Sequence, residues 1–533
     1  MLHAHLPYIR HPEHEYFLEE NWLYESITET YIPLLDLFSR LIDDGIDFRI
    51  TISLSPTLIE MFNDSLLRER YERHIKGLIE LSAREVKRTK GDIHFGPVAG
   101  MYYRRFKRAY SLFHGLFKKD LVSAFRALQE TGKVKILTSA ATHAFLPNMA
   151  AYPGAVKAQL KIGSLQYKKN FGSFPEGIWL PECGYVPGFD RYISEEGITY
   201  FFLDAHGIEQ GRPLPKHGVY SPVLCPSGAL AFGRDAETSH QVWSSIAGYP
   251  GDFNYREFYR DIGFDLDYDY IKEHLKPFGA KIFTGLKYFR ITGKTLRKKP
   301  YIISRARKKA AEHAAHFILQ REKQINLLSD SLKIKPVITA VYDAELFGHW
   351  WFEGTEWIEC LLRGIHAERR NFRTMIPSEY ISEQHFRLTG LQACELSMSS
   401  WGERGYSEVW LNDSNDYVYR HVMKAIERMH HLADTFPDEN GLLKRALNQA
   451  AREVLLSQHS DWTFIMNAGT ATEYAKKRIE NHIDRFTRLY QSVLSGNVSE
   501  PWLKEIEDKD RIFRDIDYRV YRSQLCEKSV ERV

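Results

Sequence analysis

The sequence predicts an α/β fold built around a barrel of parallel strands, and three observations lead to this prediction. In the first two thirds of the chain, short β-branched or aromatic runs alternate with longer amphipathic segments, which is the pattern of βα units. Several polar residues directly follow these runs, where barrel enzymes carry their catalytic groups. After about Met375 the strand signal disappears and helical periodicity takes over.

The strands are predicted from runs of β-branched and aromatic residues, and the opening residues around His3 and His5 are expected to form the first one. An amphipathic helix is expected at 23–41. The stretch 56–132 has several helical patterns and no convincing strand, so it is predicted to be a helical insertion between two barrel strands. The further strand candidates are 48–53, 134–137, 177–180, 200–203, 281–284 and 337–342.

The remaining chain is predicted to be helical, which gives a catalytic barrel over 1–387 and a helical C-terminal domain over 388–533. Thr470 followed by Glu473 has the spacing of a capping box that opens a helix. A second helix is expected from an apolar stripe made of Val418, Val422, Ala425, Met429 and Leu432.

Composition excludes several classes of protein. The chain has 533 residues, of which 44% are hydrophobic and 26% charged, so it is globular. A formal charge of +3 is too small for a general attraction to nucleic acid or to anionic lipid. The opening residues form no signal peptide and no run of apolar residues is long enough to span a membrane. We therefore expect a cytoplasmic protein that binds neither nucleic acid nor membrane.

The cysteines and one basic stretch give more local information. Five scattered cysteines without a CxxC pair argue against a disulfide framework and against a structural zinc site. The stretch 287–309 holds ten Lys or Arg and no acid. Because no aromatic ladder accompanies these charges, we expect a solvated loop that runs into a helix near Ser304.

Three histidines are candidates for binding. His3 and His5 are two apart in the expected first strand, so their side chains share one face. With His143 they could hold a metal ion. Alternatively, their neutral imidazoles could hydrogen-bond substrate hydroxyl groups. The residues alone leave both interpretations open.

Two carboxylates are the strongest catalytic candidates. Glu182 lies in GIWLPECGY (177–185) and Asp343 in AVYDAELFGHWW (340–351), each after a predicted strand and beside aromatic residues. Cleavage of a glycosidic bond requires such a pair, because one carboxylate attacks or stabilises the anomeric carbon and the other protonates the departing oxygen. Aromatic neighbours exclude water and so raise the pKa of the acid.

Tryptophans gather around these motifs. The chain contains 10 Trp, 30 Tyr and 31 Phe. Sugar rings stack on flat side chains, so tryptophans beside two carboxylates predict a site for a glucan chain. The polar, glycine-containing segment 399–415 is expected to form a loop that extends from the helical domain over the mouth of the barrel. The tryptophans are Trp179, Trp350, Trp351, Trp401 and Trp410.

Five motifs in this order resemble glycoside hydrolase family 57, in particular its 1,4-α-glucan branching enzymes. The motifs are LHAHLP (2–7), ATH (141–143), WLPECGY (179–185), YDAELFGHWW (342–351) and SWG (400–402). The resemblance implies an incomplete (β/α)7 barrel with helical insertions and a helical C-terminal domain.

The resemblance also implies roles for these residues. Glu182 would be the nucleophile and Asp343 the general acid/base of a retaining double displacement on an α-1,4-glucan, with no metal or other cofactor. An acceptor 6-hydroxyl would resolve the glycosyl ester into an α-1,6 branch. The residues expected to bind the glucan are His3, His5, His143, Trp179, Trp350, Trp401, Trp410 and Phe264.

The sequence departs from the family in two places. Members have a complete first strand ahead of the first motif, whereas this chain begins just before His3, so we expect a truncated or misassigned start. Branching members also carry a tyrosine on a mobile loop. The stretch expected to correspond to that loop, 225–237, offers Phe232 but no tyrosine.

Other functions stay open beside branching. An α-amylase or a 4-α-glucanotransferase would use the same residues. A metal-dependent polysaccharide deacetylase could also use paired histidines on a distorted barrel, and chelators would abolish its activity. A non-catalytic glucan-binding protein would need only the aromatic side chains, so Glu182→Gln would leave it unchanged.

Overall fold

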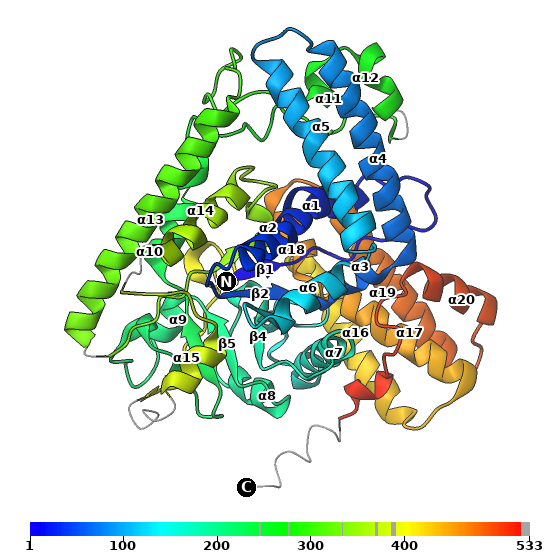
Figure 1. Cartoon of the computed structure of the whole chain (residues 1–533). Coiled ribbons are helices and arrows are strands. Elements are labelled where there is room, and N and C mark those ends of the chain that lie inside the picture. Colours follow the sequence, from blue (N-terminus) through cyan, green and yellow to red (C-terminus); the bar gives the residue numbers. More distant parts are fainter. Residues whose placement is uncertain (245–246, 276–277, 333, 368–370, 385–390, 524–533) are drawn as a thin grey trace.

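The structure, a computed structural model, describes residues 1–244, 247–275, 278–332, 334–367, 371–384 and 391–523. It is mostly helical and is organised around one curled sheet, with the N-terminus near its middle (Figure 1). The strands of this sheet are β1 (Leu2–Ala4), β2 (Ile50–Leu54), β3 (Val134–Ser139), β4 (Gly177–Trp179), β5 (Tyr200–Leu203), β6 (Val223–Leu224), β7 (Leu230–Gly233), β8 (Tyr342–Asp343) and β9 (Gln392–Ala393).

The strand order is β8-β1-β2-β3-β4-β5-β7-β6-β9, and every neighbouring pair is parallel except β6 with β7. A parallel bridge between Arg234, just after β7, and Thr339, shortly before β8, links the two ends of the parallel series. The predicted α/β class with a curled parallel sheet is therefore confirmed.

The strand predictions were right for the regions of β1 to β5 and less accurate for the strands that follow β5 in the chain. No strand forms at 281–284, because the N–H groups of Thr284 and Gly285 donate to the Asp261 carboxylate instead of to a neighbouring strand. Of 337–342, only Tyr342 lies in a strand, β8. The short strands β6, β7 and β9 were missed, and β9 follows the point at which the strand signal was expected to end.

The helices between β1 and β3 begin with a continuous segment that contains a π-helical turn. In this segment α1 (Glu20–Ser26) runs through η1 (Ile27–Tyr31) into α2 (Ile32–Asp43). Side-chain caps start the next helices: Ser55 accepts from Leu58 N–H and Asp64 from Leu67 N–H. The stretch 56–132 is helical as predicted, with α3 (Pro56–Asn63), α4 (Ser65–Arg88), α5 (Phe95–Ser111), η2 (Leu112–Leu116) and α6 (Leu121–Glu130).

The middle of the chain forms further helices. The longest of them, α13 (Ile303–Leu332), lies along the edge of the molecule opposite to α4 and α5 (Figure 1). The others are α7 (Pro153–Phe171), α8 (Phe189–Glu195), α9 (Ala205–Glu209), α10 (Ala236–Trp243), α11 (Ile262–Asp265), α12 (Tyr268–Leu275), α14 (Gly354–Ala367) and α15 (Pro377–Gln384).

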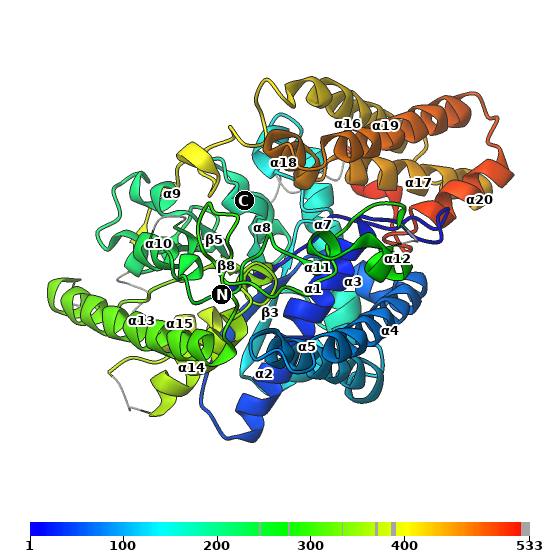
Figure 2. The same ribbon diagram turned by 90° about the horizontal axis from the view of Figure 1, so that it is seen from above.

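The C-terminal helices form a group of their own, away from α13 (Figure 2). One of them, α18, reaches back to the sheet, since Ala144 and His459 form a β-bridge and Ser460 N–H donates to the His143 carbonyl. The group consists of α16 (Asp416–Thr435), α17 (Gly441–Ser457), α18 (Ser460–Ala468), α19 (Thr472–Leu494) and α20 (Glu500–Lys509).

The predictions for this region were partly confirmed. All five residues of the apolar stripe from Val418 to Leu432 are buried in α16. The capping box is wrong, because α19 begins at Thr472 and has no side-chain cap. Leu388, the expected first residue of the C-terminal domain, lies outside the described residues, as does Cys526. Within the described part of the chain, no helix is both long and apolar enough to cross a membrane.

Candidate active site

The register of three adjacent strands brings the first site residues together. In the sheet, His3 of β1 pairs with Ser53 of β2 on one side and with Asp343 of β8 on the other. His3 Nδ1 lies 2.7 Å from Ser53 Oγ. Because the strands are parallel, Asp343 and the turn after β4 that carries Glu182 face the same end of the sheet.

Glu182 sits in a turn with unusual backbone geometry. It follows β4 in the turn Pro181–Cys183 and has a φ of 62°, in the left-handed region that a residue other than glycine rarely adopts. Trp401 donates its Nε1–H to Glu182 Oε2 at 2.7 Å, and Ser460 donates its hydroxyl to Oε1 at 3.3 Å. The carboxylate is thus held from two sides.

Burial governs the ionisation of Glu182. Loss of hydration is the largest cause that raises the pKa of this carboxyl, and the nearby charge of Asp461 adds to it. The hydrogen bonds from Trp401 and Ser460 favour the ionised form and partly offset the effect. The resulting pKa is about 7.

Asp343 is more strongly perturbed. Burial raises its pKa well above the usual range, and the carboxylates of Glu345 and then Glu182 raise it further. The guanidinium of Arg234 acts in the opposite direction. The effect of Glu182 on the pKa of Asp343 places the two predicted carboxyls in one electrostatic environment.

The three predicted histidines gather as expected, but their ring nitrogens are already engaged. His3 Nε2 lies 2.9 Å from His143 Nε2, and His143 Nδ1 lies 2.9 Å from Ser460 Oγ. His5 uses Nδ1 on Ser55 and Nε2 on Asp461, at 2.7 and 2.9 Å. The rings of His5 and His143 stack with centroids 3.7 Å apart. They form a hydrogen-bonded wall of the site.

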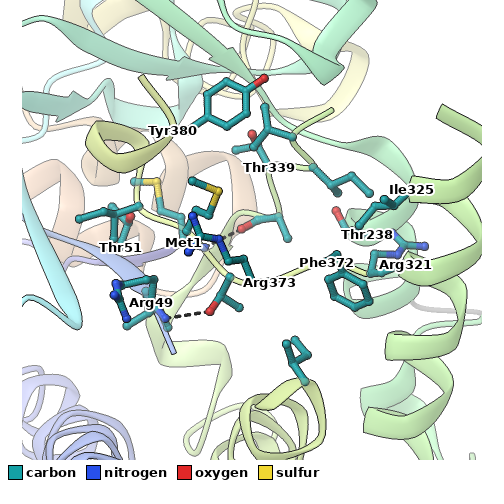
Figure 3. A pocket seen from close by; sticks show the side chains of 18 of the residues that line it. Met1, Arg49, Thr51, Thr238, Arg321, Ile325, Thr339, Phe372, Arg373 and Tyr380 are labelled. Carbon is teal, nitrogen blue, oxygen red and sulfur yellow. Dashed lines mark hydrogen bonds between the residues drawn. The ribbon is translucent and has the colours of Figure 1, made fainter. Parts of the chain in front are cut away.

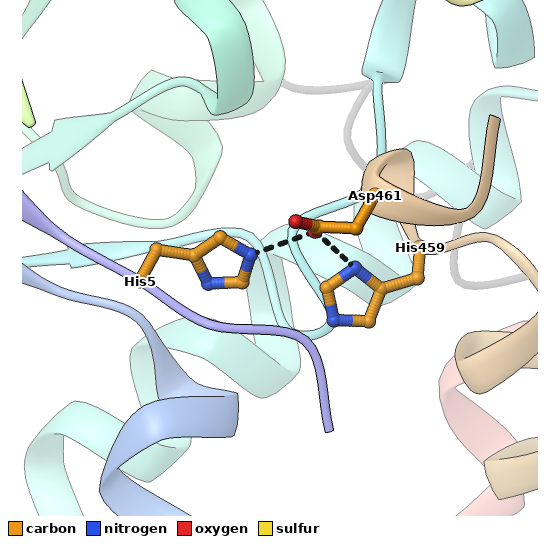
Figure 4. Close-up of side chains that lie close together, drawn as sticks. All are labelled: His5, His459 and Asp461. Carbon is orange, nitrogen blue, oxygen red and sulfur yellow. Dashed lines mark hydrogen bonds and ion pairs between the residues drawn. The ribbon is translucent and has the colours of Figure 1, made fainter. Parts of the chain in front are cut away.

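Sequence reasoning missed the residues that α18 contributes. Asp461 approaches His5 and His459, whose Nδ1 lies 2.8 Å from the same Asp461 oxygen (Figure 4). Ser460 bridges His143 and Glu182. These residues lie about 280 positions after Glu182 in the chain, and no local motif marks them, so only the tertiary structure identifies them.

Arg234 was also missed. It follows β7 and donates to Asp204 at 2.8 Å, while its guanidinium lies 5.3 Å from the Trp401 ring centroid. Asp204 directly follows the strand β5. Arg234 therefore supplies positive charge on the Asp343 side of the site.

The predicted aromatic residues divide into two groups. Trp179 and Trp410 are only 0% and 1% exposed, so they pack behind the site: Trp179 against His3 and Trp401, and Trp410 against Phe145. Trp350 and Phe264 are 53% and 44% exposed and offer open ring faces. Trp401 contacts Glu182 directly, through the loop 399–415.

Two sequence expectations differ from the structure. The stretch 225–237, expected to contain a mobile loop, forms a turn, the strand β7 and the start of α10, and Phe232 is buried in β7. Lys287, at the start of the basic stretch, is buried rather than solvated: its Nζ donates to the Phe258 carbonyl and lies over that ring. The helix predicted near Ser304 begins at Ile303.

A sizeable cavity lies elsewhere. It has a volume of about 740 Å³ and is lined by Met1, Thr51 and Thr339, together with side chains of α13 (Figure 3). Met1 and Thr51 stand at the amino ends of their strands, opposite the end that carries Glu182 and Asp343. In barrel proteins this end serves stability rather than catalysis.

Two half-buried carboxyls with raised pKa values at the ends of parallel strands, beside tryptophan and histidine, are typical of enzymes that cleave glycosidic bonds. The chain belongs to glycosyl hydrolase family 57, whose model matches residues 1–394. A second model, described as the C-terminal part of 1,4-alpha-glucan branching enzyme, matches residues 421–521.

Individual relatives cover nearly the whole chain. A 1,4-alpha-glucan branching enzyme of Thermococcus kodakarensis is 33% identical over 98% of this chain and 78% of its own length. Its solved structure superimposes with a TM-score of 0.87 at 32% identity, covering 98% of this chain and 96% of the other. The α-amylase AmyC of Thermotoga maritima has a TM-score of 0.90 at 44% identity, covering 98% of both chains.

Proposed function

We propose that this chain is a retaining 1,4-α-glucan branching enzyme, with Glu182 as nucleophile and Asp343 as general acid/base. The proposal rests above all on the pair of carboxyls at the strand ends, whose environments differ. The match of residues 421–521 to the C-terminal model of branching enzymes supports branching among the activities of the family.

The different surroundings of the two carboxyls support their roles. Glu182 accepts hydrogen bonds from Trp401 and Ser460, which stabilise an anion ready to attack the anomeric carbon. Asp343 is half-buried near the carboxylates of Glu345 and Glu182, and both its burial and these charges raise its pKa, which favours a proton on it for the departing oxygen. Such different surroundings can give two carboxyls different roles in one reaction.

The reaction then has two steps. Glu182 attacks the anomeric carbon of an α-1,4-linked glucose, and Asp343 gives its proton to the departing oxygen, so that a glycosyl ester forms on Glu182. In the second step Asp343 takes the proton of an acceptor 6-hydroxyl. The oxygen of this hydroxyl attacks the same carbon, releases Glu182 and creates an α-1,6 branch.

Exposed aromatic rings support binding of a glucan chain beside the carboxyls. Trp350 stacks on Phe258 with centroids 4.5 Å apart, and the row continues to Phe283 and Phe264 over 6.1 and 5.0 Å. Sugar units can stack on such a row. We propose that Trp350 and Phe264 contact the glucan, whereas Trp179, Trp410 and the engaged histidines shape the wall.

The proposal includes the domain organisation. Residues 1–387 would form an incomplete (β/α)7 barrel interrupted by the insertion at 56–132, and 388–533 the helical domain. The seven strands of the parallel series and the bridge from Arg234 to Thr339 support this description. A cytoplasmic location stays a prediction.

Linkage analysis of the products from amylose tests the activity. Branching predicts new chains that a debranching enzyme releases, with little net gain in reducing ends, because each cleaved bond is replaced by a new one. The matched control is Glu182→Gln, which keeps the shape of the side chain but removes the attacking carboxylate and should lose turnover by several orders of magnitude.

Hydrolysis is a second candidate, favoured by the 44% identity to a structure described as an α-amylase. It predicts abundant reducing ends and no branch points in the same experiment, and that result would contradict the branching proposal while leaving the roles of Glu182 and Asp343 intact. Unchanged amylose with both the wild type and Glu182→Gln would contradict both candidates.

A further inference from the structure

A cluster of three potential metal ligands lies beside the proposed nucleophile. It consists of His5, His459 and Asp461, whose ligand atoms all lie within 4.8 Å of one another. His5 Nε2 and His459 Nδ1 approach the same Asp461 oxygen at 2.9 and 2.8 Å, from opposite elements of the fold (Figure 4). We call these three residues the His-His-Asp cluster.

His459 is incompletely satisfied in this arrangement. Its side chain is buried, yet neither ring nitrogen makes a hydrogen bond of acceptable geometry, although Nδ1 is close to Asp461. A buried imidazole without a directed partner is costly. Its Nδ1 lone pair is therefore available to an ion held between the two side chains.

The surroundings of His5 also suit a ligand. Its Nδ1 lies 2.7 Å from Ser55 Oγ, so Nδ1–H can donate to this hydroxyl, and Nε2, which now lies 2.9 Å from Asp461, would then present its lone pair to the ion. Metal-binding histidines are commonly oriented by such a hydrogen bond from their second nitrogen. Ser55 is itself fixed as the cap of α3.

The charges around the cluster favour a cation. Asp461 raises the pKa of both Glu182 and Asp343, so several carboxyls repel one another at this place. By contrast, the other buried group of this kind, Glu453, His482 and Asp510, already has guanidinium groups of Arg478 and Arg485 against its carboxylates. An added cation would relieve repulsion only in the first group.

We propose that the His-His-Asp cluster is a binding site for a divalent transition-metal ion such as Zn²⁺, and that the bound ion inhibits the enzyme. Two imidazole nitrogens and one carboxylate oxygen are ligands for Zn²⁺ or Co²⁺, whereas Mg²⁺ and Ca²⁺ prefer all-oxygen sites. At metal–ligand distances of about 2.1 Å, the ligand atoms need to move apart by only about half an ångström.

Inhibition follows from the position of the ion. Ser460 lies between His459 and Asp461 in the chain and donates to Glu182 at 3.3 Å. An ion held by the cluster would lie next to the proposed nucleophile. Its positive charge would attract the Glu182 carboxylate and hinder the attack on the sugar, and its volume would exclude the sugar from this place. It takes no part in the reaction.

The test uses the full-length enzyme and Co²⁺, which reports its ligands by visible absorption. The wild type should bind one ion with bands typical of nitrogen and oxygen ligation, and Zn²⁺ should displace it. Asp461→Asn and His459→Asn should each weaken Co²⁺ binding by at least about tenfold. His421→Asn, on the exposed face of α16, is the matched control and should bind as the wild type does.

Circular dichroism and thermal melting establish that each variant is folded, and Asp461→Asn preserves the shape of the side chain if His459→Asn does not fold. Absence of a bound ion, or equal binding by folded Asp461→Asn, would overturn the proposal. Loss of binding in His482→Asn alone would place the ion in the other buried group and overturn it too.

A second measurement concerns inhibition of amylose conversion. Zn²⁺ should inhibit the wild type, and a chelator should restore full activity. This arm depends on the proposed glucan activity, whereas the Co²⁺ spectrum does not. A protein that binds Co²⁺ through the cluster but leaves amylose unchanged would therefore contradict the proposed function and leave the metal site standing.

Discussion

At the scale of single residues, the two carboxyls could be predicted and much of their surroundings could not. Glu182 and Asp343 follow strand-like runs, and the ends of parallel strands meet at one edge, so their proximity follows from the sequence. The engagement of His3 and His143 with each other and with serine hydroxyls depends on tertiary contacts. No spacing in the sequence reveals it.

The hydrogen bond from Trp401 to Glu182 predicts a change in pH dependence. Trp401→Phe removes a donor that stabilises the ionised carboxyl, so the pKa of Glu182 should rise from about 7. As the pH is lowered, the charged form of Glu182 should then be lost at a higher pH than in the wild type. The acidic limb of kcat/KM against pH, which reports ionisation of the free enzyme, should therefore move to higher pH.

Trp410→Phe is the matched control for this experiment. Trp410 belongs to the same loop and is buried, but its Nε1 makes no hydrogen bond. Its pH profile should keep the acidic limb of the wild type. An unshifted limb in Trp401→Phe would mean that the hydrogen bond does not set the ionisation of Glu182.

At the scale of elements, the π-helical turn η1 is the clearest link between a local irregularity and the site. Its residue Tyr31 donates to Glu345, which also accepts the His5 N–H at 3.1 Å. Glu29 in the same turn lies 2.7 Å from His349 Nδ1. A Cβ on Gly348 would lie 1.9 Å from the Glu29 carbonyl oxygen, so only glycine permits this approach.

Tyr31→Phe should destabilise the protein and impair turnover. The buried Glu345 carboxylate would lose a donor, at a cost of about 1–3 kcal/mol, which urea denaturation can measure. Because Glu345 also raises the pKa of Asp343, the substitution should lower kcat by a larger factor than the factor by which it changes KM. Tyr71→Phe is the matched control: its hydroxyl contacts Thr28 of η1 but not Glu345, so kcat should stay near the wild-type value.

The elements that were predicted wrongly share a physical reason. The run 281–284 has strand-like composition, but the Asp261 side chain accepts the N–H groups of Thr284 and of the following Gly285, which composition cannot indicate. The strands β6 and β9 have only two residues each, too short for any periodicity to be visible. Long helices such as α13 and α16 were predicted well because their pattern extends over several turns.

At the scale of the whole molecule, the sheet and the C-terminal helices are joined through the site itself. Thr142 donates to the Leu455 carbonyl, and Gln159 donates to Gln458 at 2.7 Å. On the other side, Arg10 forms a buried ion pair with Asp64 at 2.9 Å and donates to the Lys509 carbonyl. Neither part could keep these polar groups satisfied alone.

We therefore expect a single cooperative unfolding transition. Scanning calorimetry should give one peak whose calorimetric and van't Hoff enthalpies agree, if the thermal transition is reversible. Intrinsic fluorescence should follow the same transition, since tryptophans lie in both parts. Two resolved peaks, or a loss of activity well below the main peak, would show that the helices detach before the sheet unfolds.

The position of α18 has a consequence for how such a protein can diversify. The two carboxyls come from strands β4 and β8, while Ser460 and Asp461 come from a helix encoded far downstream. Substitutions in that distant stretch can reshape the space around the proposed glycosyl ester without moving the two carboxyls to which we assign the chemistry. Selection can thus change whether water or another glucan chain receives the sugar, while the chemistry of cleavage is inherited unchanged.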